Sequence, residues 1–319
     1  MIEVKNLTKR YGNHLAVDHL NFTVESGKIY GFLGPNGAGK STTMNIMTGY
    51  LGATEGQVLI DGHDILKEPE EAKKNIGYLP EIPPLYMEMT VREYLEFAAE
   101  LKGIKKDKRE PQIEEVIRLA KLRAVENRLI QNLSKGYKQR VGLAQAVLGF
   151  PEIIILDEPT VGLDPKQIIE IRELIRKLAK KHTVILSSHI LAEVREVCDY
   201  IMIISGGKLV ASDTTENLEN MMSGKGQIEV EAKAFRDEMD HIIRRTGKIK
   251  EVKYRTSASG ITTAQIIAKG GEDIREELFL AFSHADVPML TLNQSKTTLE
   301  EIFLELTQGS GNRMIKEEK

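Results

Sequence analysis

The chain has 319 residues, which is long enough for two domains that each bury a core of their own. Its formal net charge of −3 is close to neutral for this length, so no overall field favours nucleic acid or an anionic membrane as a partner. A single cysteine, Cys198, excludes an internal disulfide and any metal cluster built from cysteines. No stretch approaches the ~18 continuous apolar residues of a membrane helix, and the charged N-terminus lacks the apolar core of a signal peptide. We therefore expect a cytosolic protein without a membrane span.

The N-terminal part of the chain has strand patterns followed by a glycine-rich loop. Residues 2–12 and 15–24 alternate apolar and polar side chains, which predicts an antiparallel meander. The apolar run "KIYGFLG", residues 28–34, predicts a strand, and residues 41–51 have helical spacing. Between them stands the stretch "GPNGAGKST", residues 34–42.

Residues 88–150 differ in character and predict a mostly helical insertion between the strands of a sheet. Apolar residues recur at helical spacing in three segments: 89–103, 110–122 and 138–149. Thr90 is the expected N-cap of the first segment. The stretch 101–110 mixes basic and acidic residues and predicts a solvated loop.

Three apolar, β-branched runs follow the helical insertion. They are "EIIILDEPT" (152–160), "HTVILSSH" (182–189) and "YIMIISGGKLVAS" (200–212). Such runs suit strands that are buried on both faces of a parallel sheet. Between the first two, residues 165–181 predict an amphipathic helix with Pro165 in its first turn.

A polar, glycine-bearing break at 219–226 predicts a boundary, and we expect a second domain over residues 219–308. Its expected elements are a strand (227–234), a helix (235–246), two hairpin strands (248–256 and 260–268), a helix (271–284) and a strand (287–293). This βαββαβ order predicts a small ferredoxin-like α+β domain. A last helix is expected over 297–308, and residues 309–319 are expected to be a flexible tail.

The glycine-rich stretch satisfies the phosphate-binding pattern G-x-x-x-x-G-K-[ST], after a predicted strand and at the start of a predicted helix. Its glycines allow backbone angles at which successive N–H groups point at phosphate oxygens. Lys40 is expected to reach the β- and γ-phosphates, and the Ser41 hydroxyl to bind Mg²⁺.

Two carboxylates end the first of the later apolar runs. Asp157 is expected at the sheet edge, where it can hold Mg²⁺. Glu158 follows directly and is expected to point toward the γ-phosphate and a water, which it can deprotonate as a general base. Two acids after an apolar strand often only mark a strand end in solvent, but together with the phosphate loop they predict nucleotide hydrolysis.

These motifs, with "LSKGYKQR" at 133–140 between them, resemble the nucleotide-binding subunits of ATP-binding-cassette (ABC) transporters. The resemblance covers roughly residues 1–218 and implies an α/β P-loop NTPase cassette. Such a cassette has a mixed, mostly parallel sheet, an antiparallel N-terminal sheet and a helical subdomain, here about residues 88–150. The C-terminal third resembles the accessory domain of bacterial subunits from the type-2 exporter group.

The resemblance implies roles for individual residues. Tyr11 matches the aromatic residue that stacks on adenine, and His189 matches the switch histidine that reaches the γ-phosphate, so that Glu158, His189 and Lys40 are the expected catalytic residues. Asp164, in "GLD" at 162–164, matches the loop that crosses to a partner cassette. The loop residues expected to bind ATP are Gly34, Pro35, Asn36, Gly37, Ala38, Gly39, Lys40, Ser41 and Thr42.

The signature stretch 133–137 would serve a second cassette, because in this family two cassettes pair head to tail. The signature of one then closes over the γ-phosphate in the P-loop of the other. Ser134 Oγ and the N–H of Gly136 are the expected phosphate contacts. Lys135 replaces a glycine of the common LSGGQ form. It either points to solvent, which we favour, or adds positive charge near the phosphate.

Glu81 is a second departure from the common family pattern, which has glutamine after "LP". A carboxylate can bind Mg²⁺ at least as well as an amide, although it adds negative charge near the γ-phosphate. Some members of the exporter group also have glutamate at this position. The expected metal ligands are therefore Ser41, Glu81 and Asp157.

The resemblance implies an ATPase subunit on the cytoplasmic face of the cell membrane, with ATP and Mg²⁺ as cofactors. It would power transport through a separate integral-membrane permease, by ATP-driven pairing with a second copy or a paralogous cassette. Export is implied by the accessory domain. The alternative is a soluble cassette ATPase that acts on a ribosome or a nucleic-acid complex. This chain has neither two cassettes nor the long coiled-coil insertions of such proteins, so no nucleic-acid partner is expected.

Overall fold

The computed structural model describes residues 1–218, 227–257, 260–295, 303 and 307. These residues belong to two compact units, one formed by Met1–Thr214 together with residue 307 and the other by the described residues between Thr215 and Glu305. The expected break at 219–226 and the expected tail from residue 309 lie outside the described residues, as does most of the helix expected over 297–308. In the part of the chain that is described, no helix is both long and apolar enough to cross a membrane.

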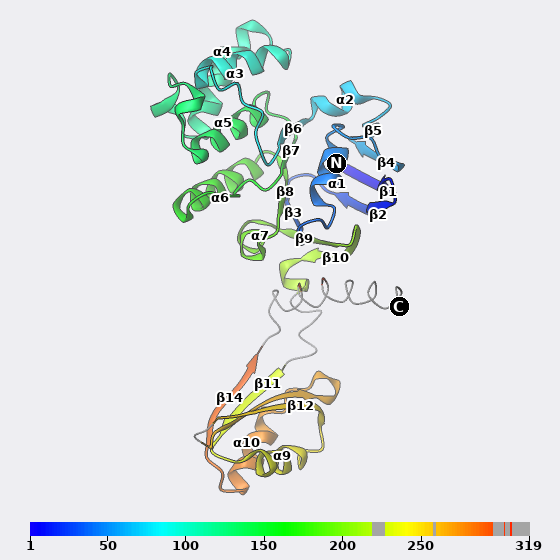
Figure 1. Ribbon diagram of the computed structural model, residues 1–319, viewed down its shortest axis with the longest axis vertical. Helices are drawn as coiled ribbons and strands as arrows, with labels where there is room; N and C mark the ends of the chain where they lie inside the picture. The colour runs from blue at the N-terminus through cyan, green and yellow to red at the C-terminus, as the bar shows by residue number, and fades with distance from the viewer. Residues whose placement is uncertain (219–226, 258–259, 296–302, 304–306, 308–319) are drawn as a thin grey trace. The chain divides into compact units, whose positions relative to one another are not determined.

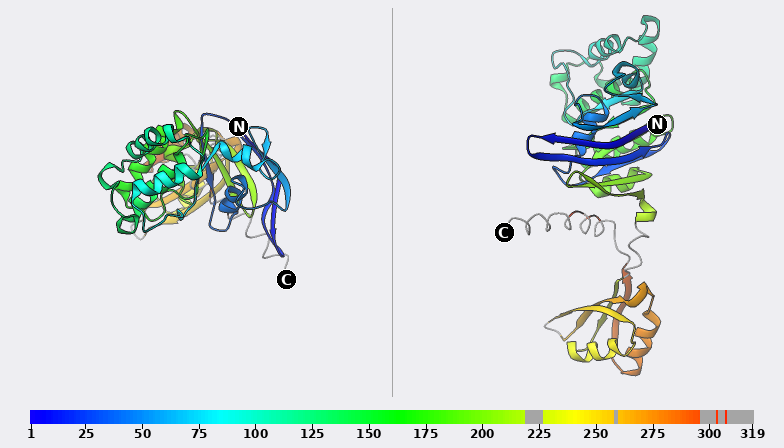
Figure 2. Two further views of the ribbon diagram at one scale, coloured as in Figure 1. Left: turned by 90° about the horizontal axis from the view of Figure 1, so that it is seen from above. Right: turned by 90° about the vertical axis from the view of Figure 1, so that its right-hand side faces the viewer.

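The N-terminal meander is a four-stranded antiparallel sheet, and its first two strands form the long dark-blue hairpin of Figure 2. In sheet order the strands are β2 (His14–Val24), β1 (Ile2–Tyr11), β4 (Glu55–Ile60) and β5 (His63–Asp64). Alternate residues such as Ile2 and Val4 on β1 are buried, as the period of two predicts.

A six-stranded sheet forms the centre of the first unit (Figure 1). In sheet order its strands are β10 (Lys208–Thr214), β9 (Tyr200–Ser205), β3 (Ile29–Leu33), β8 (Thr183–Ser188), β7 (Ile153–Leu156) and β6 (Ile76–Leu79). Neighbouring strands from β9 to β6 are parallel, and β10 is antiparallel to β9. Every residue of β3, β7 and β8 is buried, which explains why these strands have continuous apolar runs in the sequence.

The run 200–212 is a hairpin, not one strand. Gly206 and Gly207 separate β9 from β10, and both have positive φ, 55° and 78°, which a tight turn allows most easily for glycine.

The helices α3, α4 and α5 pack against one another in one part of the first unit (Figure 1), and α5 also packs against β6. The insertion contains α3 (Val91–Leu101), α4 (Lys106–Leu119), the short 3₁₀ helices η1 (Arg123–Val125) and η2 (Ile130–Asn132), and α5 (Lys135–Val147). The other helices are α1 (Lys40–Met47), α2 (Pro69–Lys74), α6 (Pro165–Ala179) and α7 (Leu191–Val197). Thr90 caps α3 through a reciprocal bond pattern with Glu93.

The loop prediction for 101–110 was wrong in its second half, because α4 begins at Lys106. Its first turns are exposed, so the charged side chains face water on a helix instead of on a loop.

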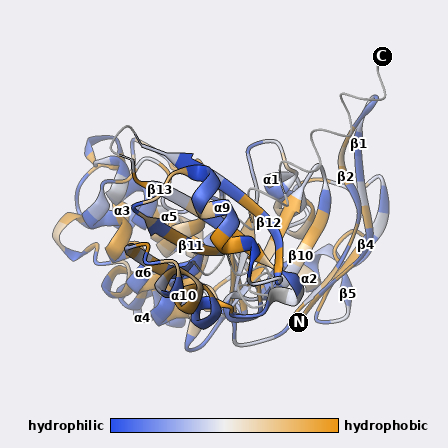
Figure 3. Ribbon diagram, turned by 90° about the horizontal axis from the view of Figure 1, so that it is seen from below, coloured by the Kyte–Doolittle hydropathy of each residue, from blue (hydrophilic) through white to orange (hydrophobic). Residues whose placement is uncertain are grey.

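The second unit has the expected βαββαβ order. Its elements are β11 (Gln227–Ala232), α9 (Arg236–Arg244), β12 (Ile249–Thr256), β13 (Thr262–Ala268), η3 (Lys269–Gly271), α10 (Arg275–His284) and β14 (Met289–Ser295). The antiparallel sheet order β12-β13-β11-β14 is that of a ferredoxin-like domain. Figure 3 shows both hydrophilic and hydrophobic residues along α9, whose Met239, Ile242 and Ile243 are buried in the core of this unit.

Candidate active site

The glycine-rich loop joins the buried end of β3 to the start of α1. Gly39 is the N-cap of α1 and has φ 104°, a backbone conformation that side chains with a Cβ rarely adopt. A Cβ on Gly39 would also lie 2.6 Å from the carbonyl oxygen of Ala16, and one on Gly34 would collide with that of Ile204. The loop therefore holds its shape only with glycine at these two positions.

Lys40 lies inside this loop, with 5% of its surface exposed. Its Nζ donates to the carbonyl oxygens of Gly34 at 2.8 Å and Pro35 at 3.3 Å. The same Nζ is 3.7 Å from Glu158 Oε1, so the ammonium group faces both the loop and the carboxylate at the end of β7. A buried ammonium group held by carbonyls in this way is a strong donor for a phosphate oxygen.

Asp157 lies at the carboxyl end of β7 and is buried. Ser41 Oγ donates to Asp157 Oδ1 at 3.2 Å, and Ser187 Oγ donates to the same oxygen at 2.5 Å. Sequence reasoning did not identify Ser187. The available signal was that polar residues end β8 and directly follow β7, and the carboxyl ends of parallel strands meet at one sheet edge.

Glu158 has φ 48°, an uncommon value for a residue other than glycine. Its N–H donates to Ser187 Oγ at 2.9 Å, and its Oε2 lies 3.0 Å from His189 Nδ1. This backbone conformation directs the Glu158 side chain away from Asp157 and toward Lys40 and His189. Strained backbone of this kind persists where the surrounding contacts hold it, and it is concentrated at functional sites.

A cavity of about 490 Å³ brings Lys40, Glu158 and His189 together. Of the residues expected from the sequence, those that line it are Tyr11, Asn36, Gly37, Gly39, Lys40, Ser41, Thr42, Glu81, Glu158 and His189. His14, Ala16 and Val161 also line it and were not anticipated. Gly34, Pro35 and Ala38 are not among its lining residues; they belong to the loop behind it. Tyr11 is half exposed at the cavity, with Lys9 Nζ 5.3 Å from its ring centre.

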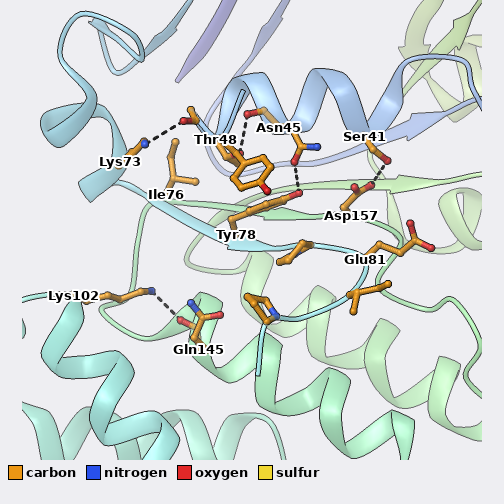
Figure 4. Close-up of a pocket in the computed structure, with 15 residues that line it drawn as sticks. Ser41, Asn45, Thr48, Lys73, Ile76, Tyr78, Glu81, Lys102, Gln145 and Asp157 are labelled. Carbon is orange, nitrogen blue, oxygen red and sulfur yellow. Dashed lines mark hydrogen bonds between the residues drawn. The ribbon is translucent and has the colours of Figure 1, made fainter. Parts of the chain in front are cut away.

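A second cavity, of about 860 Å³, adjoins the first, and Ser41 and Glu81 line both (Figure 4). Asp157 lines the second cavity only. Two large apolar side chains, Tyr50 and Ile82, line it while remaining 81% and 82% exposed. Exposed apolar residues around a cavity are typical of a surface that binds another protein.

Two lysines on opposite sides of the second cavity donate to carbonyl oxygens (Figure 4). Lys73 Nζ donates to the carbonyl oxygen of Gly49 at 3.3 Å, and Lys102 Nζ donates to that of Gln145 at 2.9 Å. Although Lys102 is an exposed residue, its ammonium group lies against the end of α5, and burial lowers its pKa to about 8.

Ser134 begins the signature helix. It is the N-cap of α5, and its Oγ accepts from the N–H of Tyr137 at 3.4 Å. Gly136 is buried, and a Cβ there would lie 2.5 Å from Gln167 Oε1. None of the residues 133–137 is among those that line the cavity beside Lys40.

Lys135 is exposed, and its Nζ lies so close to Gly162 that a Cβ on that glycine would collide with it. Two residues further on, Asp164 is the N-cap of α6 and accepts from the N–H of Gln167 at 2.9 Å. The signature start and the loop 162–164 thus lie side by side on one chain, a proximity that the sequence did not reveal.

The donors near Ser41 suit a hard divalent cation, because hydroxyl and carboxylate oxygens are the ligands that Mg²⁺ prefers. Ser41, Asp157 and Glu81 all line the second cavity, and Ser41 and Asp157 are in direct contact. Among the described residues, no group of three or more His, Cys, Asp or Glu is arranged to hold a metal ion. A cation here would therefore need further oxygens, as Mg²⁺ takes from water and phosphates.

Cys198 has a packing role. It is buried against Gly31 of β3, where a Cβ would lie 2.8 Å from Cys198 Sγ, and burial raises the pKa of the thiol.

Comparison with known proteins identifies the family. Residues 17–161 match the family model described as "ABC transporter". The chain is 35% identical to the bacitracin transport ATP-binding protein BcrA of Bacillus licheniformis, over 97% of this chain and 98% of that protein. It is 31% identical to the linearmycin resistance ATP-binding protein LnrL of Bacillus subtilis, over 96% and 98%.

Solved structures agree with this relationship. The structure of an ATP-binding subunit of an ABC transporter has a TM-score of 0.64 at 32% identity, over 69% of this chain and 92% of that one. A dimeric structure of the cassette MJ0796, in a post-hydrolysis state with ADP and Pi bound, has a TM-score of 0.62 at 28% identity, over 67% and 98%. The expected P-loop cassette fold is confirmed, and the chain belongs to the ABC transporter family as an ATP-binding subunit that hydrolyses ATP.

Proposed function

We propose that this subunit powers export through a separate membrane permease, by ATP-driven pairing of two cassettes. The observation that carries the proposal is the pair of adjoining cavities, because the first suits a nucleotide and the second suits a protein segment. The relatives named for bacitracin transport and linearmycin resistance match nearly the whole chain, which favours export over uptake. The proposed location is the cytoplasmic face of the membrane.

In the first cavity, the loop N–H groups and Lys40 bind the phosphates of ATP, and Tyr11 packs against adenine. Glu158 accepts a proton from the attacking water, since it is buried, adjoins the cavity and is held by His189. Ser41, Asp157 and Glu81 are the residues that would hold Mg²⁺, which supplies charge neutralisation at the β- and γ-phosphates.

The signature of one cassette completes the site of another. Ser134 and Gly136 contact the γ-phosphate in a partner's P-loop, and Asp164 lies in the loop that faces the partner. The support is that residues 133–137 do not line their own chain's cavity, while α5 presents its N-terminus, which attracts anions, at an exposed serine. The partner is a second copy or a paralogue.

The second cavity receives a short segment of the permease. Tyr50 and Ile82 offer apolar surface, and Glu81 connects this cavity to the first one. A segment that moves Glu81 therefore acts on the nucleotide site directly.

Purification of the tagged full-length protein from detergent-extracted membranes tests this function. We expect one multi-span membrane protein in stoichiometric amount. Recovery with ribosomes or nucleic acid, and without such a partner, would instead support the soluble ATPase alternative.

The Glu81→Gln variant is expected to keep kcat for ATP hydrolysis within about threefold of the parent, because either oxygen can serve Mg²⁺. Steady-state ATPase kinetics measure this, with the exposed Glu88→Gln as matched control. A loss of about 100-fold with ATP binding intact would show that the charge of Glu81 is needed for the chemical step.

A further inference from the structure

Glu193, on α7, is a buried carboxylate that the proposed mechanism does not use. Only 6% of its surface is exposed, and it does not line the cavity beside Lys40. Burial of a carboxylate is costly unless hydrogen bonds compensate it. The groups that donate hydrogen bonds to the Glu193 carboxylate therefore indicate its role.

Two hydroxyl groups from other segments of the chain donate to its side chain. Thr160 Oγ1 donates to Glu193 Oε2 at 2.5 Å, and Ser188 Oγ donates to the same oxygen at 3.0 Å. Ser188 Oγ in turn accepts from the N–H of Ile190 at 3.0 Å. Thr160 and Ser188 are themselves buried, so these bonds are protected from water.

The two hydroxyls flank the two residues proposed to act on the attacking water. Thr160 stands two positions after Glu158, and Ser188 stands directly before His189. One carboxylate oxygen thus joins the chain after β7 to the last residue of β8. The side chains of Glu158 and His189 meet 3.0 Å apart at the same junction.

We propose that Glu193 is a positioning residue for ATP hydrolysis: it holds these two segments together so that His189 and Glu158 meet in the reactive arrangement. The inference rests on the proposed roles of Glu158 and His189. This role also accounts for the strained φ of Glu158, because such a backbone conformation needs contacts that hold it on both sides. Ser187 Oγ accepts from the N–H of Glu158, and Glu193 accepts from Thr160, two residues further along the chain.

The test replaces Glu193 with leucine, which removes the acceptor and keeps much of the volume. We expect kcat to fall about tenfold or more while KM for ATP stays within about threefold, because nucleotide contacts are untouched. Glu193→Gln should recover at least about half of the parental kcat, since one amide oxygen can accept both bonds. Glu196→Leu, an exposed change on the same helix, is the matched control.

The double variant Glu193→Leu/His189→Ala separates positioning from general stability. If Glu193 acts through His189, adding Glu193→Leu to His189→Ala lowers kcat by no more than about twofold. Full additivity, a parallel change in KM, or parental kcat in Glu193→Leu would overturn the proposal.

Two further variants separate a loss of folding from a loss of positioning, and the role of Glu193 from that of His189. Should Glu193→Leu fail to fold, Thr160→Val/Ser188→Ala removes the two donors instead, and parental kcat in that variant would equally overturn the proposal. His189→Ala alone tests the proposed role of His189: parental kcat in His189→Ala removes both claims, whereas a strongly lowered kcat in His189→Ala with parental kcat in Glu193→Leu removes only the positioning role.

Discussion

Replacing Glu158 with glutamine is expected to lower kcat for ATP hydrolysis by about 100-fold or more, because it removes a general base. ATP binding should remain, since the loop and Lys40 are unchanged. Glutamine also removes the negative charge 3.7 Å from Lys40 Nζ, which leaves the ammonium group free for phosphate. The variant should therefore accumulate as a closed dimer when ATP is present.

Single-turnover ATPase assays and size-exclusion chromatography with and without ATP measure the two effects. Glu152→Gln makes the same chemical change at the opposite end of β7, at an exposed position, and should behave like the parent. A Glu158→Gln protein that hydrolyses ATP at the parental rate would exclude Glu158 as the base.

The features that sequence predicted best are local ones. The phosphate loop needs only its own glycines, a preceding strand and a following helix, all of which lie within residues 28–51. The continuous apolar runs of β7 and β8 likewise reveal full burial without knowledge of their neighbours. Thr90 and Pro165 were correctly expected at helix starts because capping involves only a few consecutive residues.

The features that sequence missed depend on which strands are neighbours. Ser187 joins Asp157 to the N–H of Glu158 only because β8 lies beside β7, a pairing of segments about 30 residues apart. Glu193 is similar, since its helical position alone predicts only a surface acid. No local pattern reports such contacts, because they follow from sheet order and not from residue spacing.

Lys135 also makes a contact that its sequence position does not predict. Its sequence position allows contact with solvent or with phosphate, and in the structure its exposed side chain lies against Gly162, in the loop that follows Glu158. Because that loop also contains Asp164, a lysine in the signature can support the loop of its own chain while Ser134 stays free for the proposed contact with a partner cassette.

Replacing Lys40 with alanine is expected to weaken ATP binding by about 10- to 100-fold, the usual range for a charge-assisted hydrogen bond to phosphate. It also leaves Glu158 without its cationic neighbour in the buried site. Equilibrium titration with a fluorescent ATP analogue measures the loss. Lys28→Ala, at the other end of β3, is the matched control because its ammonium pairs with Glu25 on the surface. Unchanged affinity in Lys40→Ala would contradict the proposed binding mode.

Lys40→Ala also tests whether two chains share each site. Ser134→Asp keeps a good N-cap for α5 but places negative charge where the partner's γ-phosphate is expected. Each variant alone should be nearly inactive, since both sites of its homodimer are damaged. A mixed dimer instead contains one site with an intact Lys40 and an intact Ser134, from different chains. An equimolar mixture should therefore recover about a quarter of the parental activity, because half of the dimers are mixed and each has one intact site. If Ser134 served its own chain's nucleotide, mixing would restore nothing.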